Sequence, residues 1–156
     1  MIIIFDNVIS EFQANYCIEL VKSSKPTQEF AGRYCYNNES LFFQYLPFRE
    51  IMDCIINKAR DIIPDIQVDW SEINYWPKGS NHNSHFDESS PNTVMTSVTY
   101  LNLDYRGGET FFDDGTLLSP LVGRTVFFDG KKYKHGVRTI SHGERFSLPI
   151  WYKFNK

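Results

Sequence analysis

The chain has 156 residues, which suits a single domain, and 42% of them are hydrophobic, enough for a sizeable core. A formal net charge of -3 argues against a strongly electrostatic nucleic-acid binder, so we do not expect a nucleic-acid partner. No apolar stretch approaches a membrane span, and the N-terminal apolar run lacks the features of a signal sequence. Three cysteines without a Cys-x-x-Cys pair fit reduced thiols, so we expect a cytoplasmic protein with no membrane partner.

The first part of the chain, to about residue 64, is predicted to be a helical support for the C-terminal part. Residues 2–5 read as a short buried strand. Residues 11–23 have apolar side chains at helical spacing, and Ser10 is a suitable N-cap for them. Pro47 opens a second amphipathic helix over about 48–62.

The aromatic segment 28–46 between these helices is irregular and is typical of a strand followed by a loop. Residues 31–46 combine aromatic side chains with Gly32 and two asparagines, so they are a candidate lid over a site. A packed connecting segment is the equal alternative.

After Pro64, short apolar or alternating runs are separated by turn residues at regular intervals. The predicted strands are 66–76, 82–87, 94–103, 108–112, 123–129, 134–140 and 145–154. Many short strands with turn signals indicate an all-β sandwich or barrel, with the two preceding helices packed on one face. We therefore expect one domain over 1–156, with a β core over about 65–156.

His85 and Asp87 are the first candidates for chemistry, because residues i and i+2 of a strand project to the same face. A second histidine from a distant strand, such as His135, would complete a set of two imidazoles and one carboxylate. That set, with open positions opposite, suits a non-haem iron(II) oxygenase. A lone His-x-Asp is a weak signal, since a hydrogen-bonded surface pair is commoner.

Arg145 enters the last predicted strand, which is otherwise largely apolar and aromatic. A buried guanidinium is costly unless it is paired. A dicarboxylate co-substrate would pair it through two parallel hydrogen bonds, and an internal Asp or Glu is the even alternative.

Taken together, the C-terminal half resembles the 2-oxoglutarate/Fe(II) dioxygenases of the prolyl 4-hydroxylase group. The resemblance covers about residues 72–154 and rests on the order and spacing of several short motifs. These are Tyr75, Gly79, His85-Phe-Asp87, Tyr100-Leu-Asn102, Gly107-Gly-Glu-Thr110, Pro120 with Gly123, Phe127-Phe-Asp-Gly130, His135-Gly-Val, Gly143-Glu-Arg145 and Trp151-Tyr152.

The resemblance implies a double-stranded β-helix, or jelly roll, and an enzyme that uses Fe(II), 2-oxoglutarate and O2, with ascorbate as a candidate reductant. It also implies the role of each matching residue. Iron would be held by His85, Asp87 and His135; the distal carboxylate of 2-oxoglutarate by Arg145 and Tyr100; Tyr75 would line the cavity near the metal, and Trp151 would stand near the substrate mouth.

The sequence departs from the group at two positions. His82 stands where a tyrosine is common, three residues before the first iron ligand, which raises the alternative that His82 is the ligand. We prefer His85 because Asp87 follows it by two, and assign His82 to the substrate side. We reject His142 as third ligand because of its predicted turn position. Pro149 replaces a hydroxyl residue four after Arg145, so one carboxylate hydrogen bond is expected to be missing.

Three functions stay open at this point. The first is hydroxylation of a prolyl residue in a peptide or protein. The second is the same chemistry on a free amino acid, another small molecule or an alkylated nucleobase. The third is a jelly-roll binding module without turnover, which Arg145 argues against because a pure binder has no need for a buried cation.

Overall fold

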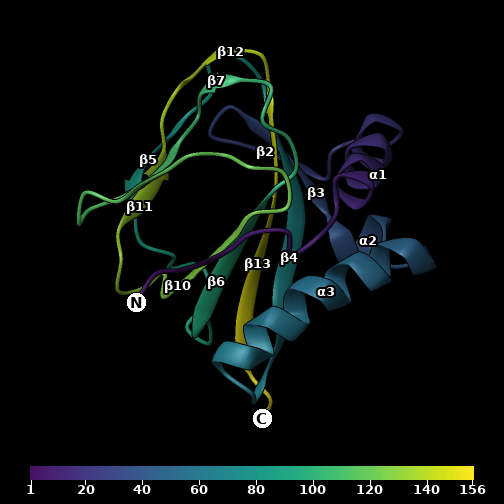
Figure 1. The fold of residues 1–156 in the computed structure, drawn as a ribbon, viewed down its shortest axis with the longest axis vertical. Coiled ribbons are helices and arrows are strands. Elements are labelled where there is room, and N and C mark those ends of the chain that lie inside the picture. The colour runs from purple at the N-terminus through teal and green to yellow at the C-terminus, as the bar shows by residue number, and fades with distance from the viewer.

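The computed structural model describes residues 1–156 and consists of three layers (Figure 1). Three helices cover one face of a seven-stranded sheet, and a smaller four-stranded sheet lies against the opposite face. All strand pairs are antiparallel. This is the predicted mainly β jelly roll with helices packed on one face. None of the helices is both long and apolar enough to span a membrane.

The large sheet draws its strands from both ends of the chain. In spatial order they are β1 (Ile3–Phe5), β10 (Thr125–Phe128), β6 (Met95–Tyr100), β13 (Arg145–Phe154), β4 (Ile66–Trp76), β3 (Arg33–Asn37) and β2 (Gln28–Phe30). The long strands β13 and β4 form its centre, so the end of the chain is held between strands from the middle of the sequence.

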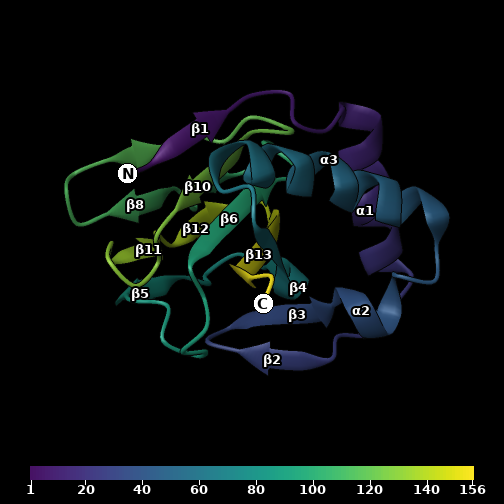
Figure 2. The same ribbon diagram turned by 90° about the horizontal axis from the view of Figure 1, so that it is seen from below.

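The small sheet has the order β5 (His82–His85), β11 (His135–Val137), β8 (Thr110–Phe112) and β9 (Leu117–Leu118). A separate two-stranded ribbon pairs β12 (Ile140–His142) with β7 (Arg106–Gly107). Seen from below in Figure 2, β5, β11 and β8 lie on the side of the large sheet that faces away from α1 and α3.

The helices are α1 (Glu11–Lys22), α2 (Asn38–Leu41) and α3 (Leu46–Ile62). Ser10 caps α1 as predicted, and its side chain and that of Gln13 form a reciprocal capping box. Helix α3 begins one residue before Pro47. Proline lacks a backbone N–H, and this costs nothing in the first turn because the N–H groups there have no partner within the helix.

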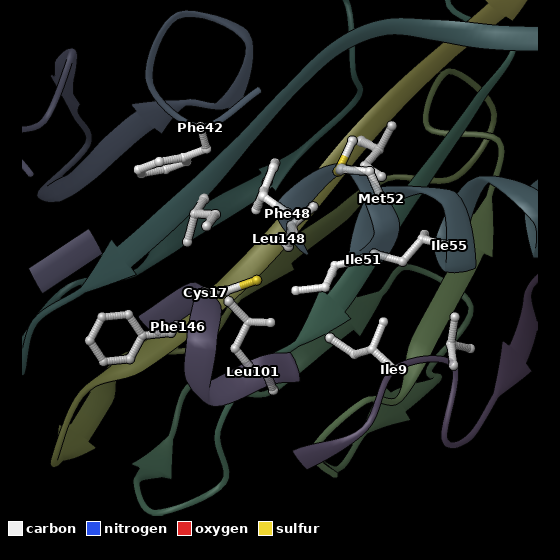
Figure 3. Packing of buried hydrophobic residues seen from close by; sticks show 14 of the residues in the cluster. Ile9, Cys17, Phe42, Phe48, Ile51, Met52, Ile55, Leu101, Phe146 and Leu148 are labelled. Atoms are coloured by element: carbon white, nitrogen blue, oxygen red, sulfur yellow. The ribbon is translucent and has the colours of Figure 1, made fainter. Parts of the chain in front are cut away.

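The main hydrophobic core fills the space between the helices and the large sheet (Figure 3). Cys17 of α1 and Ile51 and Ile55 of α3 pack there against the strands. Strand β13 supplies alternate residues to this layer, and those are Phe146, Leu148, Ile150 and Tyr152. The other alternate set of β13 therefore faces the small sheet.

The N-terminal part holds the predicted helices and, as β1, the strand predicted at residues 2–5, and it contributes two further strands to the large sheet where one was expected. Strands β2 and β3 form a hairpin whose second strand pairs with β4. Residues 31–46 are thus mostly β3 and α2, and Phe42 among them is buried. This is the packed connecting segment of the two alternatives, and only the hairpin next to Arg33 adjoins a cavity.

Candidate active site

Three predicted metal ligands meet at one point between the two sheets. The ligand atoms of His85, Asp87 and His135 all lie within 4.8 Å of one another. The register of β5 and β11 places His85 directly opposite His135, so cross-strand pairing brings the two imidazoles together. The backbone N–H of Asp87 donates to the carbonyl of Gly130 at 2.8 Å, which holds the carboxylate beside them.

The two histidines are oriented with the same ring nitrogen toward the cluster. His85 Nδ1 lies 2.7 Å from the carbonyl oxygen of Asn83, and His135 Nδ1 lies 2.9 Å from that of Tyr133. A carbonyl can only accept, so Nδ1 carries the proton in each ring and Nε2 presents a lone pair. This is the tautomer that metal-binding histidines adopt when a backbone carbonyl orients them.

The carboxylate of Asp87 divides its two oxygens between different neighbours. Oδ1 lies 3.2 Å from His135 Nε2 and 3.7 Å from His85 Nε2. Oδ2 accepts hydrogen bonds from the Thr96 hydroxyl at 2.7 Å and from the Trp151 indole N–H at 3.3 Å. Burial opposes ionisation of Asp87, but its neighbours His135, Thr96 and His85 together hold its pKa below the ordinary value.

A cavity of about 400 Å³ opens in front of these side chains. Its wall on the large sheet is formed by residues of β13 that alternate with the core set, namely Arg145, Ser147, Pro149 and Trp151. Asn74 and Trp76 of β4 and Thr96 and Val98 of β6 continue that wall. The volume is in the range of sites that bind small molecules.

Arg145 lies in the cavity wall and is 1% exposed. Its guanidinium stands 5.0 Å from the Trp76 ring and 5.3 Å from the Tyr100 ring, and one nitrogen donates to Thr110 at 3.2 Å. Nε and Nη1 are buried without a hydrogen-bond partner, and no acidic residue forms an ion pair with it. The alternative of an internal Asp or Glu partner is therefore wrong, and the side chain is free to receive an external anion.

Tyr100 lies next to Arg145, but it is not among the residues that line the cavity, so its contact with 2-oxoglutarate stays a prediction. Its hydroxyl donates to Thr110 at 2.7 Å, and the ring is fully buried behind that residue. Pro149 also lines the cavity and offers no hydroxyl. The hydroxyl groups of Thr110 and Tyr100 lie beside the Arg145 guanidinium and offer the polar contacts that Pro149 cannot make.

Tyr75 does not line the cavity, contrary to the expectation. Successive residues of β4 point to opposite faces, so Asn74 and Trp76 face the cavity and Tyr75 faces the helices. The Tyr75 ring stacks on Tyr34 and Phe146, and its hydroxyl donates to Glu144 at 2.7 Å. The cavity position expected for Tyr75 is occupied by its neighbour Trp76.

The remaining predicted residues lie close to their expected places. His82 lines the cavity and stacks on His85 with ring centroids 3.8 Å apart, but it is not among the clustered ligand atoms. Burial, together with Arg33 and the neighbouring imidazoles, lowers the pKa of His82 to about 3. Trp151 stands in the cavity wall, and His142 is exposed on the separate ribbon.

Sequence reasoning missed Arg33, which lies in the cavity wall on β3 and is 8% exposed. Its guanidinium packs 4.7 Å from the Trp76 ring, and Nε and Nη1 have no hydrogen-bond partner. A second pocket of about 450 Å³ adjoins the first and shares Phe30, Arg33, Ser89 and Trp151 with it. An arginine in an aromatic strand was the only available signal, the same one that singled out Arg145.

The family model of the 2OG-Fe(II) oxygenase superfamily matches residues 71–153, more than half of the chain. The chain belongs to this superfamily. Prolyl 3-hydroxylase 3 of Homo sapiens is 34% identical over 64 residues, which cover 36% of this chain and 9% of the human protein. The matched segment is thus a small part of that relative, and the corresponding Mus musculus protein matches to the same extent.

Solved prolyl hydroxylases share the fold of this oxygenase. The viral collagen prolyl hydroxylase vCPH from Paramecium Bursaria Chlorella virus-1, in its 2OG complex, aligns with a TM-score of 0.78 at 18% identity, covering 99% of this chain and 96% of that one. A prolyl-4-hydroxylase from Pseudomonas putida gives a TM-score of 0.78 at 17% identity, covering 99% and 93%. The TM-scores show a shared fold, and at identities this low the likeness shows the fold alone.

The residues present fit the cofactors of the superfamily. Two neutral imidazoles and one carboxylate are the donor set of non-haem iron(II) oxygenases, and their ligand atoms are already gathered. The two orphaned nitrogens of Arg145 fit the planar, two-point recognition of a carboxylate such as that of 2-oxoglutarate. The residues of the site therefore fit the Fe(II), 2-oxoglutarate and O2 chemistry of the superfamily.

Proposed function

We propose that this oxygenase hydroxylates a prolyl residue within a peptide or protein. Iron(II), 2-oxoglutarate and O2 supply the oxidising chemistry when bound. In this proposal His85, Asp87 and His135 hold the metal, and Arg145 with Tyr100 holds the distal carboxylate of 2-oxoglutarate. The aromatic walls of Trp76 and Trp151 exclude water and orient the substrate.

The observation that favours a peptide over a free amino acid is the second pocket next to the cavity. It provides room for residues that flank the one being hydroxylated, and the two pockets share four lining residues. Arg33 lies between them with two unpartnered nitrogens, so it is placed to donate to a carbonyl of the bound chain. A prolyl hydroxylase from Trichoplax adhaerens, solved with a hypoxia inducible factor peptide fragment, has the same fold with a TM-score of 0.79 at 14% identity, covering 98% of this chain and 83% of that one.

The proposal is tested by measuring succinate formation with Fe(II) and 2-oxoglutarate, in the presence of single-proline pentapeptides or of free L-proline. We expect the peptides to stimulate turnover and to gain one oxygen atom, detected by mass spectrometry, while free proline does neither. Asp87→Ala should abolish turnover in every case. Stimulation by free proline alone would favour the small-molecule alternative, and no succinate formation at all would leave only a binding module.

Arg33→Met separates the two arginines within the same assay. We expect it to raise the apparent KM for the peptide and to leave that for 2-oxoglutarate unchanged, whereas Arg145→Met should raise the latter. An increase in the 2-oxoglutarate KM alone for Arg33→Met would move Arg33 from the substrate to the co-substrate. We further propose that ascorbate serves as the reductant and that the protein is cytoplasmic. Adding ascorbate to the assay tests the first proposal, and cell fractionation tests the second.

A further inference from the structure

We infer that Thr96 and Trp151 are positioning residues that make Asp87 a one-oxygen metal ligand. The inference rests on the proposed function, because it concerns the same metal site. Thr96 and Trp151 both donate to Oδ2 of Asp87, at 2.7 Å and 3.3 Å, and Oδ1 alone faces the two histidines. The two oxygens of one carboxylate thus have separate tasks.

The sheet register explains why these two donors act together. Thr96 of β6 and Trp151 of β13 are directly opposite each other in the antiparallel ladder, so their side chains stand side by side on the cavity face. Asp87 reaches this pair from the segment that follows β5, where its backbone N–H donates to the carbonyl of Gly130. Two neighbouring strands of the large sheet therefore fix the orientation of a ligand that lies just beyond the end of β5.

The division of the carboxylate has a consequence for the metal. A carboxylate that binds through both oxygens occupies an additional coordination position, whereas the two-histidine, one-carboxylate set needs positions left open for the reactants. Asp87 is 9% exposed, and a buried carboxylate oxygen needs hydrogen-bond donors. Thr96 and Trp151 supply those donors to Oδ2, and both are neutral groups. Loss of a donor would free Oδ2 to turn toward the metal.

Trp151 gives this arrangement a link to the substrate side. Its ring lines both the metal-site cavity and the second pocket, while its indole N–H holds the metal ligand. A chain bound across the two pockets touches the same ring that orients Asp87. The longer bond from Trp151 makes it the weaker of the two donors, so Thr96 carries most of the effect.

The test uses Co(II) as the probe, with its visible absorption reporting both affinity and coordination. Thr96→Val removes the hydroxyl at nearly constant shape, and we expect about 10–100-fold weaker Co(II) binding with a changed absorption spectrum. Trp151→Phe should show a smaller change in the same direction. Thr96→Ser keeps the donor and should restore affinity and spectrum.

Thr99→Val is the matched control, because Thr99 lies on the same strand and makes a buried hydrogen bond to Thr125 at 2.8 Å, away from Asp87. It should lower the thermal midpoint about as much as Thr96→Val and leave Co(II) binding unchanged. Wild-type affinity and spectrum in Thr96→Val, or equal weakening in Thr99→Val, would overturn the inference alone. Co(II) binding that survives Asp87→Ala would overturn the metal site of the proposed function as well.

Discussion

Arg145→Met is expected to leave the ligand-free oxygenase at least as stable as the wild type while greatly weakening its affinity for 2-oxoglutarate. The guanidinium is 1% exposed, two of its nitrogens have no hydrogen-bond partner, and no carboxylate is paired with it. Replacing buried ionic groups by apolar residues of similar volume is often neutral or stabilising by roughly 1–4 kcal/mol. The ring contacts with Trp76 and Tyr100, at about 0.5–2 kcal/mol each, offset part or all of this gain.

The magnitudes on stability and binding have opposite signs. A net gain of about 1 kcal/mol would raise the thermal midpoint by roughly 2–4 °C for a domain of this size. Hydrogen bonds to charged groups contribute about 1.5–3 kcal/mol each. Two lost bonds to a carboxylate therefore correspond to about a 100-fold or greater loss of 2-oxoglutarate affinity, at about 1.4 kcal/mol per factor of ten.

Differential scanning fluorimetry with and without 2-oxoglutarate measures both effects in one experiment. The wild type should gain stability with added 2-oxoglutarate, because a ligand that binds only the folded state raises the midpoint. Arg145→Met should start from an equal or higher midpoint and gain almost nothing. A variant that melts several degrees lower yet still responds to 2-oxoglutarate would refute the view that this cation is held for an external anion.

Three further changes test the site from different sides. Gly130→Ala should weaken metal binding about tenfold or more, measured by Co(II) titration, because its Cβ would clash with Oδ2 of Asp87. Unchanged affinity would show that the carboxylate has room to move. The wild type should lose stability as the pH falls from 6.5 toward 3, because His82 takes up a proton in the unfolded chain but not in the folded one, where its pKa is lowered. In His82→Asn the thermal midpoint should fall less over this pH range, and a profile identical to the wild type would contradict this cause. Tyr75→Phe should lower the free energy of unfolding by about 1 kcal/mol and leave the KM for 2-oxoglutarate unchanged, whereas Tyr100→Phe should raise that KM. A raised KM in Tyr75→Phe with an unchanged KM in Tyr100→Phe would mean that the two faces of the sheet are wrongly assigned.

The sequence by itself determined most of the strands and the identity of the clustered ligands. At the start of β13, Arg145 and Ser147 alternate with Phe146 and Leu148, so the pattern there places Arg145 on the face opposite Phe146. The order of the motifs identifies His85, Asp87 and His135 as one set, and their ligand atoms do converge. Strand β5 ends at His85, so Asp87 joins the histidines from the segment beyond the strand, and not by the alternation that a spacing of two predicts. These features are local or carried by motif order, which is why they are readable from the chain.

Only the tertiary structure decided the features that depend on how distant segments meet. Strand β4 has apolar side chains on both faces, so its pattern does not tell whether Tyr75 or Trp76 enters the cavity; the packing of the helices on one face decides it. Arg33 reaches the cavity because β3 pairs with β4. Thr96 meets Asp87 because β6 and the small sheet face each other across the site. A hydroxyl within a strand gives no sign of its partner until two sheets are placed one against the other.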